Sequence, residues 1–230
     1  MLPDDGINMF LMDPPYSSGG ITLSARKQPT GKKYLNRDGT SLPDFFGDAM
    51  DSRAYCFYMR EVLFTAFNKT KPGGILCVFI DWRNLPAMSD AIQMSGWTWR
   101  GILAWDKGTT RGQVGRFRQD CEFIVWASKG KTDNPPDCGA HIFPGCYHIS
   151  SVIGNKKIHQ TQKPVELIKR LLKISGDKWT ICDPFMGSGT TGVACLQMGR
   201  NFVGFELSKE YYAVAADRLE EQQAEQVHNT

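Results

Sequence analysis

The last quarter of the chain alternates between two apolar patterns, and this alternation constrains the fold more than any other feature. Short apolar runs alternate with segments of helical spacing. They predict a strand, a helix, a strand and a helix over Trp179–Cys182, Thr190–Met198, Phe202–Phe205 and Ser208 to about Gln223. Such alternation is typical of a parallel sheet covered by helices, because each helix carries the chain back to the start of the next strand. The sequence therefore predicts an α/β fold with a mostly parallel central sheet.

A pair of glycines lies where the first of these strands turns into its helix. Gly187 and Gly189 permit a tight turn and a close backbone approach, and the start of the helix presents free N–H groups to an anion such as a carboxylate. Glu206 follows the next strand, where an acidic residue can accept both hydroxyls of a ribose. An ordinary strand-to-helix turn is the alternative. The third dinucleotide glycine and a P-loop Gly-Lys-Ser/Thr are absent from the pattern, so S-adenosylmethionine suits it better than NAD or ATP.

The same patterns divide the rest of the chain into elements. They predict a buried strand Ile7–Met12, a helix from Ser52 to Phe67, a strand Ile75–Ile80, a helix from about Pro86 to Ser95, a hairpin of Trp97–Trp105 with Cys121–Ala127, and a helix opened by Pro164. Residues 17–51 are rich in Gly, Ser, Thr and Pro and predict a long mobile loop. Residues 131–155 predict either loop or a small recognition segment. We expect residues 1–230 to form a single domain.

The strand Ile7–Met12 ends at a motif that resembles a known family. Asp13-Pro14-Pro15-Tyr16 matches Asn/Asp/Ser-Pro-Pro-Tyr/Phe, the signature of enzymes that methylate exocyclic amino groups. The chain resembles the beta group of the DNA amino-methyltransferases, in which this motif comes first and the Asp183–Gly189 segment comes last, a circular permutation of the usual order. Further matching segments are Trp105–Lys107, Gly115–Arg118, Glu122–Gly130 and His159–Pro164. The resemblance implies a Rossmann-like methyltransferase fold dependent on S-adenosylmethionine, with helices on both faces of the sheet and a β-hairpin on its C-terminal side.

The resemblance also implies an activity and a set of site residues. The Asp form of the signature suggests methylation of N6 on a flipped adenine in DNA, because Ser commonly replaces Asp in N4-cytosine enzymes. N4-cytosine methylation is the alternative. The implied catalytic residues are Asp13, Pro14, Pro15 and Tyr16. The implied cofactor-binding residues are Asp183, Pro184, Phe185, Gly187, Ser188, Gly189, Thr190, Glu206, Thr161 and Lys163.

The chemistry of an amino group explains the catalytic motif independently of the family. The N6 lone pair is delocalised into the ring, so attack on a sulfonium methyl needs acceptors that hold the amino hydrogens while the nitrogen becomes tetrahedral. Asp13 supplies one acceptor and the Pro14 carbonyl is a candidate for the second. Tyr16 offers an aromatic face to an extruded base. Methyl donor and acceptor must meet, so we expect both motifs at one carboxyl edge of the sheet. A plain surface turn is the alternative for so short a proline motif.

The charge of the chain is compatible with a nucleic-acid partner but does not identify one. A net charge of +3 and a pI near 8.4 are mild. Two local basic clusters predict phosphate contacts with double-stranded DNA: Arg26, Lys27, Lys32, Lys33 and Arg37, and Lys107, Arg111, Arg116 and Arg118. Solvated loop charge is the alternative for each cluster. Residues 131–155 are short for the target-recognition region of this family, which suggests a relaxed or very short target sequence.

Cysteine usage and hydropathy predict where the protein works. The chain has seven cysteines, an odd number, and most lie in apolar runs as buried free thiols do, which points to a reducing cytoplasm. No apolar stretch approaches the length of a membrane span. Cys138, His141, Cys146 and His148 are spaced too closely for a familiar zinc module, so we expect no metal. The sequence leaves a homodimer open.

One departure from the family concerns the start of the chain. The family often has a strand and an acidic residue just before the catalytic motif, near the cofactor adenine, but here only twelve residues precede Asp13. An upstream start codon, weakened cofactor binding, or compensation by Asp4 and Asp5 would each explain this. A catalytically impaired DNA-binding relative is therefore one rival hypothesis. An enzyme that methylates RNA or a protein amide is another, although protein-amide enzymes usually carry Asn at the position of Asp13.

Overall fold

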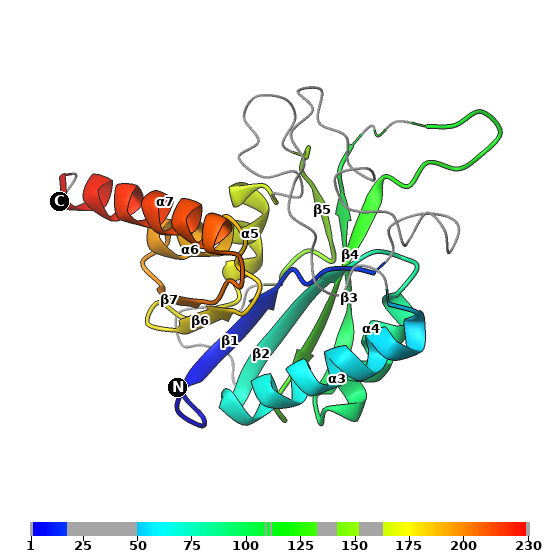
Figure 1. Ribbon diagram of the computed structural model, residues 1–230, viewed down its shortest axis with the longest axis horizontal. Helices are drawn as coiled ribbons and strands as arrows, with labels where there is room; N and C mark the ends of the chain where they lie inside the picture. The colour runs from blue at the N-terminus through cyan, green and yellow to red at the C-terminus, as the bar shows by residue number, and fades with distance from the viewer. Residues whose placement is uncertain are drawn as a thin grey trace.

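A computed structural model describes residues 2–17, 50–108, 110, 112–132, 142–151 and 163–228 of the chain. In these ranges one seven-stranded sheet has the order β5-β3-β4-β2-β1-β6-β7 (Figure 1). Its strands are β1 (Ile7–Met12), β2 (Thr70–Ile80), β3 (Thr98–Asp106), β4 (Cys121–Ser128), β5 (Cys146–His148), β6 (Thr180–Asp183) and β7 (Asn201–Gly204). β4 is antiparallel to both neighbours, and every other adjacent pair is parallel. The predicted mostly parallel sheet with a β3-β4 hairpin is confirmed.

Helices cover both faces of this sheet, as expected (Figure 1). α3 (Ser52–Lys69) and α4 (Leu85–Met94) pack on one face, and α5 (Val165–Leu172) and α6 (Thr190–Gln197) pack on the other. α7 (Lys209–His228) packs against α6. No helix in the described ranges is long and apolar enough to cross a membrane.

β1 is buried from both sides, which explains why its sequence is apolar except at Asn8, whose Oδ1 accepts from the N–H of Thr180 at 3.0 Å. Successive side chains of a strand point to opposite faces. Phe10 and Met12 pack into the core beneath α3 and α4, whereas Met9 and Leu11 pack into the core beneath α5 and α6. A strand placed at the centre of a parallel sheet has no polar face. β1 can therefore carry polar catalytic groups only beyond its end.

Asp51 caps the start of α3, one residue before the predicted start of the helix at Ser52. Oδ1 of Asp51 accepts hydrogen bonds from the N–H groups of Arg53 and Ala54, both at 2.9 Å. These are two of the donors that the first turn of a helix leaves free. Ser52 is the first helical residue, and its hydroxyl donates to Oδ1 of Asn84 at 2.9 Å. Ser52 thus connects α3 to the residue before α4.

β2 begins earlier than its sequence predicts and contains an irregularity. Its register with β1 is broken at the Lys-Pro-Gly-Gly segment, so that residues 71–74 bulge from the ladder. The backbone of Lys129, just after β4, closes this bulge. Its carbonyl accepts from the N–H of Gly73 at 2.8 Å, and its N–H donates to the carbonyl of Gly74 at 2.9 Å. Pro72, Gly73 and Gly74 do interrupt the regular strand pairing, but the interruption lies within β2 and not before it.

β5 is a strand that the sequence did not predict. It consists of Cys146–His148 and pairs in parallel with the end of β3. Three residues are too few for a period to be detected, so its segment was expected to be loop or a recognition appendage. Much of that segment, residues 133–141 and 152–155, lies outside the described residues, as does most of the expected mobile loop 17–51. The single-domain assignment and the recognition role of residues 131–155 stay predictions.

Gly74 allows a test of the bulge in β2. A Cβ atom at this position would lie 2.8 Å from the carbonyl oxygen of Asn8 and 2.9 Å from that of Lys71. Because both are backbone atoms held in the sheet, we expect Gly74→Ala to lower the free energy of unfolding by about 1 to 3 kcal/mol. Gly145→Ala is the matched control, since a Cβ there meets nothing within 4 Å. Urea unfolding followed by circular dichroism compares the two, and equal stability would contradict this account of the bulge.

Candidate active site

Parallel pairing of β1 with β6 brings the two sequence motifs to one edge of the sheet. Phe10 pairs with Cys182, so Asp13 follows β1 close to the point where Asp183 ends β6. The two strands run in the same direction, and their carboxyl ends therefore lie at the same edge. The expected convergence of the catalytic motif and the glycine turn is confirmed.

Side chains from distant parts of the chain form a hydrogen-bonded charge cluster at this edge. The hydroxyl of Tyr16 donates to Oδ1 of Asp13 at 2.8 Å and also lies 3.1 Å from Oε2 of Glu122. The ammonium of Lys163 donates to Oδ2 of Asp13 at 2.8 Å and lies 3.4 Å from Oε2 of Glu122. Lys107 donates to Oε1 of Glu122 at 3.3 Å. Two carboxylates and two ammonium groups thus balance one another around one phenol.

Burial and charge act against each other in this cluster. Burial raises the pKa of Asp13 above its usual range, and the Lys163 ammonium opposes that rise. For Glu122, burial is outweighed by the charges of Lys163 and Lys107, which hold its pKa below the usual range. For Lys163, burial is outweighed by the two carboxylates, which raise its pKa. Burial, and then the same carboxylates, raises the pKa of Tyr16, so its hydroxyl keeps its proton.

The Asp-Pro-Pro-Tyr segment is fixed by its backbone as well as by its side chains. Nδ2 of the buried Asn84 donates to the carbonyl of Tyr16 at 2.7 Å. Pro14 is buried, and its carbonyl accepts no hydrogen bond from the part of the chain that the structure describes. An acceptor without a partner, in a segment stiffened by two prolines, is available to a donor that enters the site.

Two glycines shape the turn between β6 and α6. Gly187 has φ +51° and Gly189 has φ +81°, in the left-handed region that favours glycine. Among the described residues, a Cβ atom at Gly187 would meet nothing within 4 Å. Glu206 holds the turn from β7: its Oε2 accepts from the N–H of Gly187 and its Oε1 accepts from the N–H of Ser208, both at 2.9 Å. The predicted nucleoside-binding carboxylate therefore lies beside the predicted nucleoside-binding turn.

Asp183 is buried beneath this turn and orients it. Its Oδ1 accepts from the N–H of Phe185 at 2.9 Å, and its Oδ2 accepts from the hydroxyl of Thr191 at 2.7 Å. Burial raises the pKa of Asp183 to about 7. Both carboxyl oxygens are engaged within the protein, so this side chain fixes the start of α6 relative to β6.

The predicted cofactor residues divide into two groups in the structure. Pro184, Phe185, Gly187, Ser188, Gly189 and Thr190 lie in the turn and at the first position of α6. Lys163 instead contacts Asp13 of the catalytic motif, 2.8 Å away. Thr161 lies outside the described residues. The turn is therefore one half of the site, and Lys163 belongs spatially to the other half.

The suggestion that Asp4 and Asp5 replace a missing acidic residue at the cofactor is wrong. Both precede β1 and so lie at the opposite end of that strand from Asp13. Each is used in an ion pair there: Asp4 with Lys69 at 2.6 Å, and Asp5 with Lys129 at 2.7 Å. These pairs join the N-terminal segment to the ends of α3 and β4.

Glu122 is a residue of the cluster to which the sequence analysis gave no role. It is the second residue of β4, and its side chain is only 19% exposed. One signal was present in the sequence, because a carboxylate directly precedes the apolar run Phe123–Ala127 of a predicted strand. A charged side chain in a buried strand needs a partner, although the sequence does not say which.

The basic residues expected to contact DNA have different surroundings where they are described. Lys107 is engaged with Glu122, and Arg118 is 3.2 Å from Asp120 in an ion pair. Arg116 is exposed and has no ion pair among the described residues. The remaining predicted DNA contacts, Arg26, Lys27, Lys32, Lys33, Arg37 and Arg111, lie outside the described residues. DNA contact by all of these residues stays a prediction.

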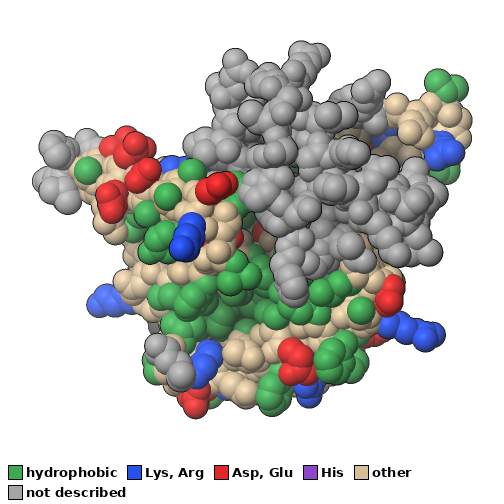
Figure 2. Space-filling view, in the orientation of Figure 1, with side chains coloured by type: hydrophobic (Ala, Val, Ile, Leu, Met, Phe, Trp, Pro, Cys, Tyr) green, Lys and Arg blue, Asp and Glu red, His purple; other side chains and the backbone are tan. Residues whose placement is uncertain are grey.

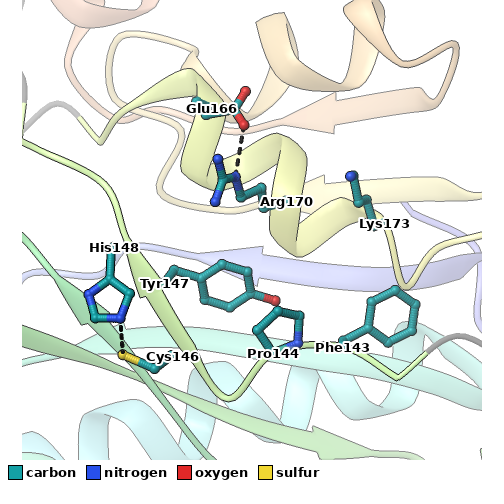
Figure 3. Close-up of a pocket in the computed structure, with 8 residues that line it drawn as sticks. All are labelled: Phe143, Pro144, Cys146, Tyr147, His148, Glu166, Arg170 and Lys173. Atoms are coloured by element: carbon teal, nitrogen blue, oxygen red, sulfur yellow. Dashed lines mark hydrogen bonds and ion pairs between the residues drawn. The ribbon is translucent and has the colours of Figure 1, made fainter.

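A hollow of about 340 Å³ lies away from this site, between β5 and α5 (Figure 3). Tyr147 and Pro144 line it from one side, and the Glu166 and Arg170 pair, 2.8 Å apart, lines it from α5. At its rim, Sγ of Cys146 lies 3.9 Å from Nε2 of His148. The described residues contain no group of three or more side chains suited to a metal ion, and Cys138 and His141 lie outside them.

The fold is that of an α/β methyltransferase, with the Asp-Pro-Pro-Tyr motif and the glycine turn at one edge of its sheet. Comparison with known proteins agrees, because the N6/N4 DNA methylase family profile matches residues 7–217. The chain belongs to this family. Type II methyltransferase M2.DpnII of Streptococcus pneumoniae is 29% identical over 235 residues, covering 94% of this chain and 83% of that protein.

Solved structures give the same result for the fold. The crystal structure of the M1.HpyAVI-SAM complex is 26% identical with a TM-score of 0.67, covering 93% of this chain and 88% of that one. PvuII DNA methyltransferase, described as cytosine-N4-specific, has a TM-score of 0.70 at 17% identity, covering 96% of this chain and 85% of its own. At that identity the PvuII likeness concerns the fold alone.

Removal of Lys163 tests the charge balance of the cluster. Lys163→Met leaves the carboxylates of Asp13 and Glu122 buried without the cation between them, so we expect the free energy of unfolding to fall by about 3 kcal/mol at about pH 8. Without the ammonium, burial raises the pKa of Asp13 unopposed, and the folded state then binds protons more tightly than the unfolded chain. The deficit should therefore shrink towards about pH 4. Urea unfolding at both pH values measures it, with the exposed Lys173→Met as control; a deficit independent of pH would contradict the prediction.

Proposed function

We propose that this DNA methylase transfers a methyl group from S-adenosylmethionine to the N6 amino group of a flipped adenine in double-stranded DNA. The observation that carries the proposal is the position of Asp13 and of the Pro14 carbonyl, which has no hydrogen-bond partner among the described residues, one strand away from the Gly187 turn that Glu206 holds. An amino group and a methyl donor held at these two strand ends would be neighbours. This is the geometry that direct methyl transfer requires.

The glycine turn and Glu206 suit a nucleoside with an amino-acid tail. The space at Gly187 lets a ligand approach the backbone, and Gly189, the residue before α6, places no side-chain cap on the first N–H groups of the helix. Glu206, held by Gly187 and Ser208, would accept the ribose hydroxyls. When bound, S-adenosylmethionine supplies a sulfonium methyl group as the electrophile. Asp183, Phe185 and Thr190 would shape the turn around it.

Asp13 and the Pro14 carbonyl would act on the amino group. Each can accept one amino hydrogen, since a carboxylate oxygen already bonded to Tyr16 or Lys163 retains a further lone pair. Holding both hydrogens in place favours a tetrahedral nitrogen whose lone pair is free to attack. The methylated nitrogen must then lose one proton, and Asp13, whose pKa is raised by burial, can accept it.

Tyr16 and the cluster around it would position the base. Lys163 lies 5.2 Å from the centre of the Tyr16 ring, so a stacked base would use the opposite face of the ring. The Tyr16 hydroxyl is fixed between Asp13 and Glu122, so the plane of the ring is set before the substrate arrives. The Asp in the signature favours adenine as the substrate base, because enzymes that methylate N4 of cytosine more commonly carry Ser at this position.

Mass spectrometry of nucleosides tests the proposed function directly. Plasmid DNA from a host without DNA methylation is incubated with the protein and S-adenosylmethionine, then digested to nucleosides. We expect N6-methyladenine, and Asp13→Ala should abolish it. N4-methylcytosine would overturn the assignment of the base. Methyl transfer to RNA or protein but not to DNA, or none in any substrate, would overturn the enzyme assignment in favour of the rival hypotheses.

Two substitutions should separate catalysis from cofactor binding. Asp13→Ala removes an acceptor, so we expect kcat to fall by about 100-fold or more while the Kd for S-adenosylmethionine stays within about twofold. Glu206→Ala removes the carboxylate at the ribose, so we expect that Kd to rise by about tenfold. Isothermal titration calorimetry and a tritium-transfer assay measure both quantities. Glu210→Ala, an exposed carboxylate at the start of α7, is the control. Equal cofactor affinity in Asp13→Ala and Glu206→Ala would contradict the division of roles.

A further inference from the structure

The connection between β3 and β4 ends in a tight, well-defined turn. We refer to residues 112–118 as the hairpin tip. The N–H of Arg116 donates to the carbonyl of Gln113 at 3.2 Å, and Gly115 has φ +75°, as the third position of a type II turn requires. A Cβ atom at Gly112 would lie 3.1 Å from Cγ of Arg118, so the two arms of the hairpin lie close together there. The tip is a built element with a defined shape.

Two apolar side chains of the hairpin tip are fully exposed. Val114 is 106% exposed and Phe117 is 96% exposed, so neither packs against the rest of the protein. By comparison, Phe57 on the outer side of α3 keeps part of its surface covered at 68% exposure. An isolated exposed apolar residue needs no explanation, but two within four residues of a projecting turn are suited to insertion into a partner.

The position of the hairpin tip relates it to the active site. β3 runs parallel to β1, so its end and the start of β4 lie at the same edge of the sheet as Asp13. At the base of the hairpin, Lys107 contacts Glu122 of the charge cluster at 3.3 Å. Figure 1 shows the segment between β3 and β4 extending away from the body of the molecule, and Figure 2 shows hydrophobic and basic side chains together on this projection.

The charges of the hairpin tip favour a polyanion as the partner. Arg116, between the two apolar residues, has no ion pair among the described residues. Arg118 follows directly, and its partner Asp120 lies nearer the base, where it also accepts from the N–H of Thr110 at 3.0 Å. An exposed apolar pair with unneutralised arginine beside it is the combination with which proteins enter a kinked or unstacked duplex.

We propose that Val114 and Phe117 form an apolar wedge that enters the DNA duplex beside the flipped target base. This inference rests on the proposed function, because a base that leaves the stack for Asp13 leaves a gap behind it. An apolar side chain that fills the gap offsets the lost stacking, and Arg116 holds the adjacent phosphate. The hairpin extends from the same sheet edge as the catalytic motif, so one docked duplex can meet both.

Methylation of two matched duplexes tests the wedge. The target sequence is first mapped by sequencing the DNA that the unaltered protein modifies. Duplex oligonucleotides then carry the target base either correctly paired or opposite a mismatch that already loosens it. For Val114→Ser/Phe117→Ser we expect kcat/KM on the paired duplex to fall by about tenfold, and by less than about threefold on the mismatched duplex, because less stacking then has to be replaced. Phe117→Leu, which keeps an apolar side chain, should retain most of the activity.

The controls distinguish failure of the wedge from failure of the proposed function. Phe57→Ser removes an exposed aromatic side chain elsewhere and should leave both rates unchanged. If the unaltered protein methylates no DNA, the proposed function fails. If it does methylate DNA and the double variant loses activity equally on both duplexes, or not at all, the wedge is overturned while the function stands. A dimer in sedimentation that the double variant converts to a monomer would also overturn it, since the tip would then be an interface between copies of the chain.

Discussion

Parallel pairing of β1 with β6 is the constraint on which the site depends. It joins the first strand of the chain to a strand more than 170 residues later, and it brings Asp13 next to the turn that begins at Asp183. Apolar side chains on both faces of β1 stabilise this pairing, since Met9 and Phe10 belong to different cores. The order of the motifs along the chain can therefore be permuted without harm, because adjacency in the sheet, and not adjacency in sequence, brings them together.

The charge cluster turns this adjacency into a fixed geometry. Lys163 is bonded to Asp13 and close to Glu122, and Tyr16 bridges the same two carboxylates from the other direction. Burying such charges opposes folding unless each is paired. In the proposed function, this is the place where the Asp13 carboxylate has to be held in one orientation. Glu122 lies on β4, away in sequence from the Asp-Pro-Pro-Tyr segment, yet it holds Tyr16 and Lys163, the two side chains that hold Asp13.

Helices and strands were predictable from the sequence where they are long enough to show a hydrophobic period. The side-chain contacts of the site were not predictable. The strand before Asp13, the glycine turn and the hairpin follow from apolar runs and breakers that are local in sequence. β5 has three residues and no period of its own, so its pairing with β3 left no local signal. The contact of Lys163 with Asp13 and the place of Glu122 in the cluster were not predictable, because which side chains meet at a sheet edge depends on strand order. The sequence also does not show which end of β1 lies at the site. For this reason Asp4 and Asp5, which precede the strand, were candidates to replace an acidic residue at the cofactor.

Strand order also decides which parts of the reaction can be neighbours. Adjacent strands are about 4.8 Å apart, so the end of β1 lies one spacing from β6 and two spacings, about 10 Å, from the start of β4. In the proposed function, a base held at Asp13 would therefore lie one strand from a donor at the glycine turn. Asp13 is only 26% exposed and is held inside the charge cluster, so the arrangement favours a substrate base that has left the helix over one that remains stacked inside it.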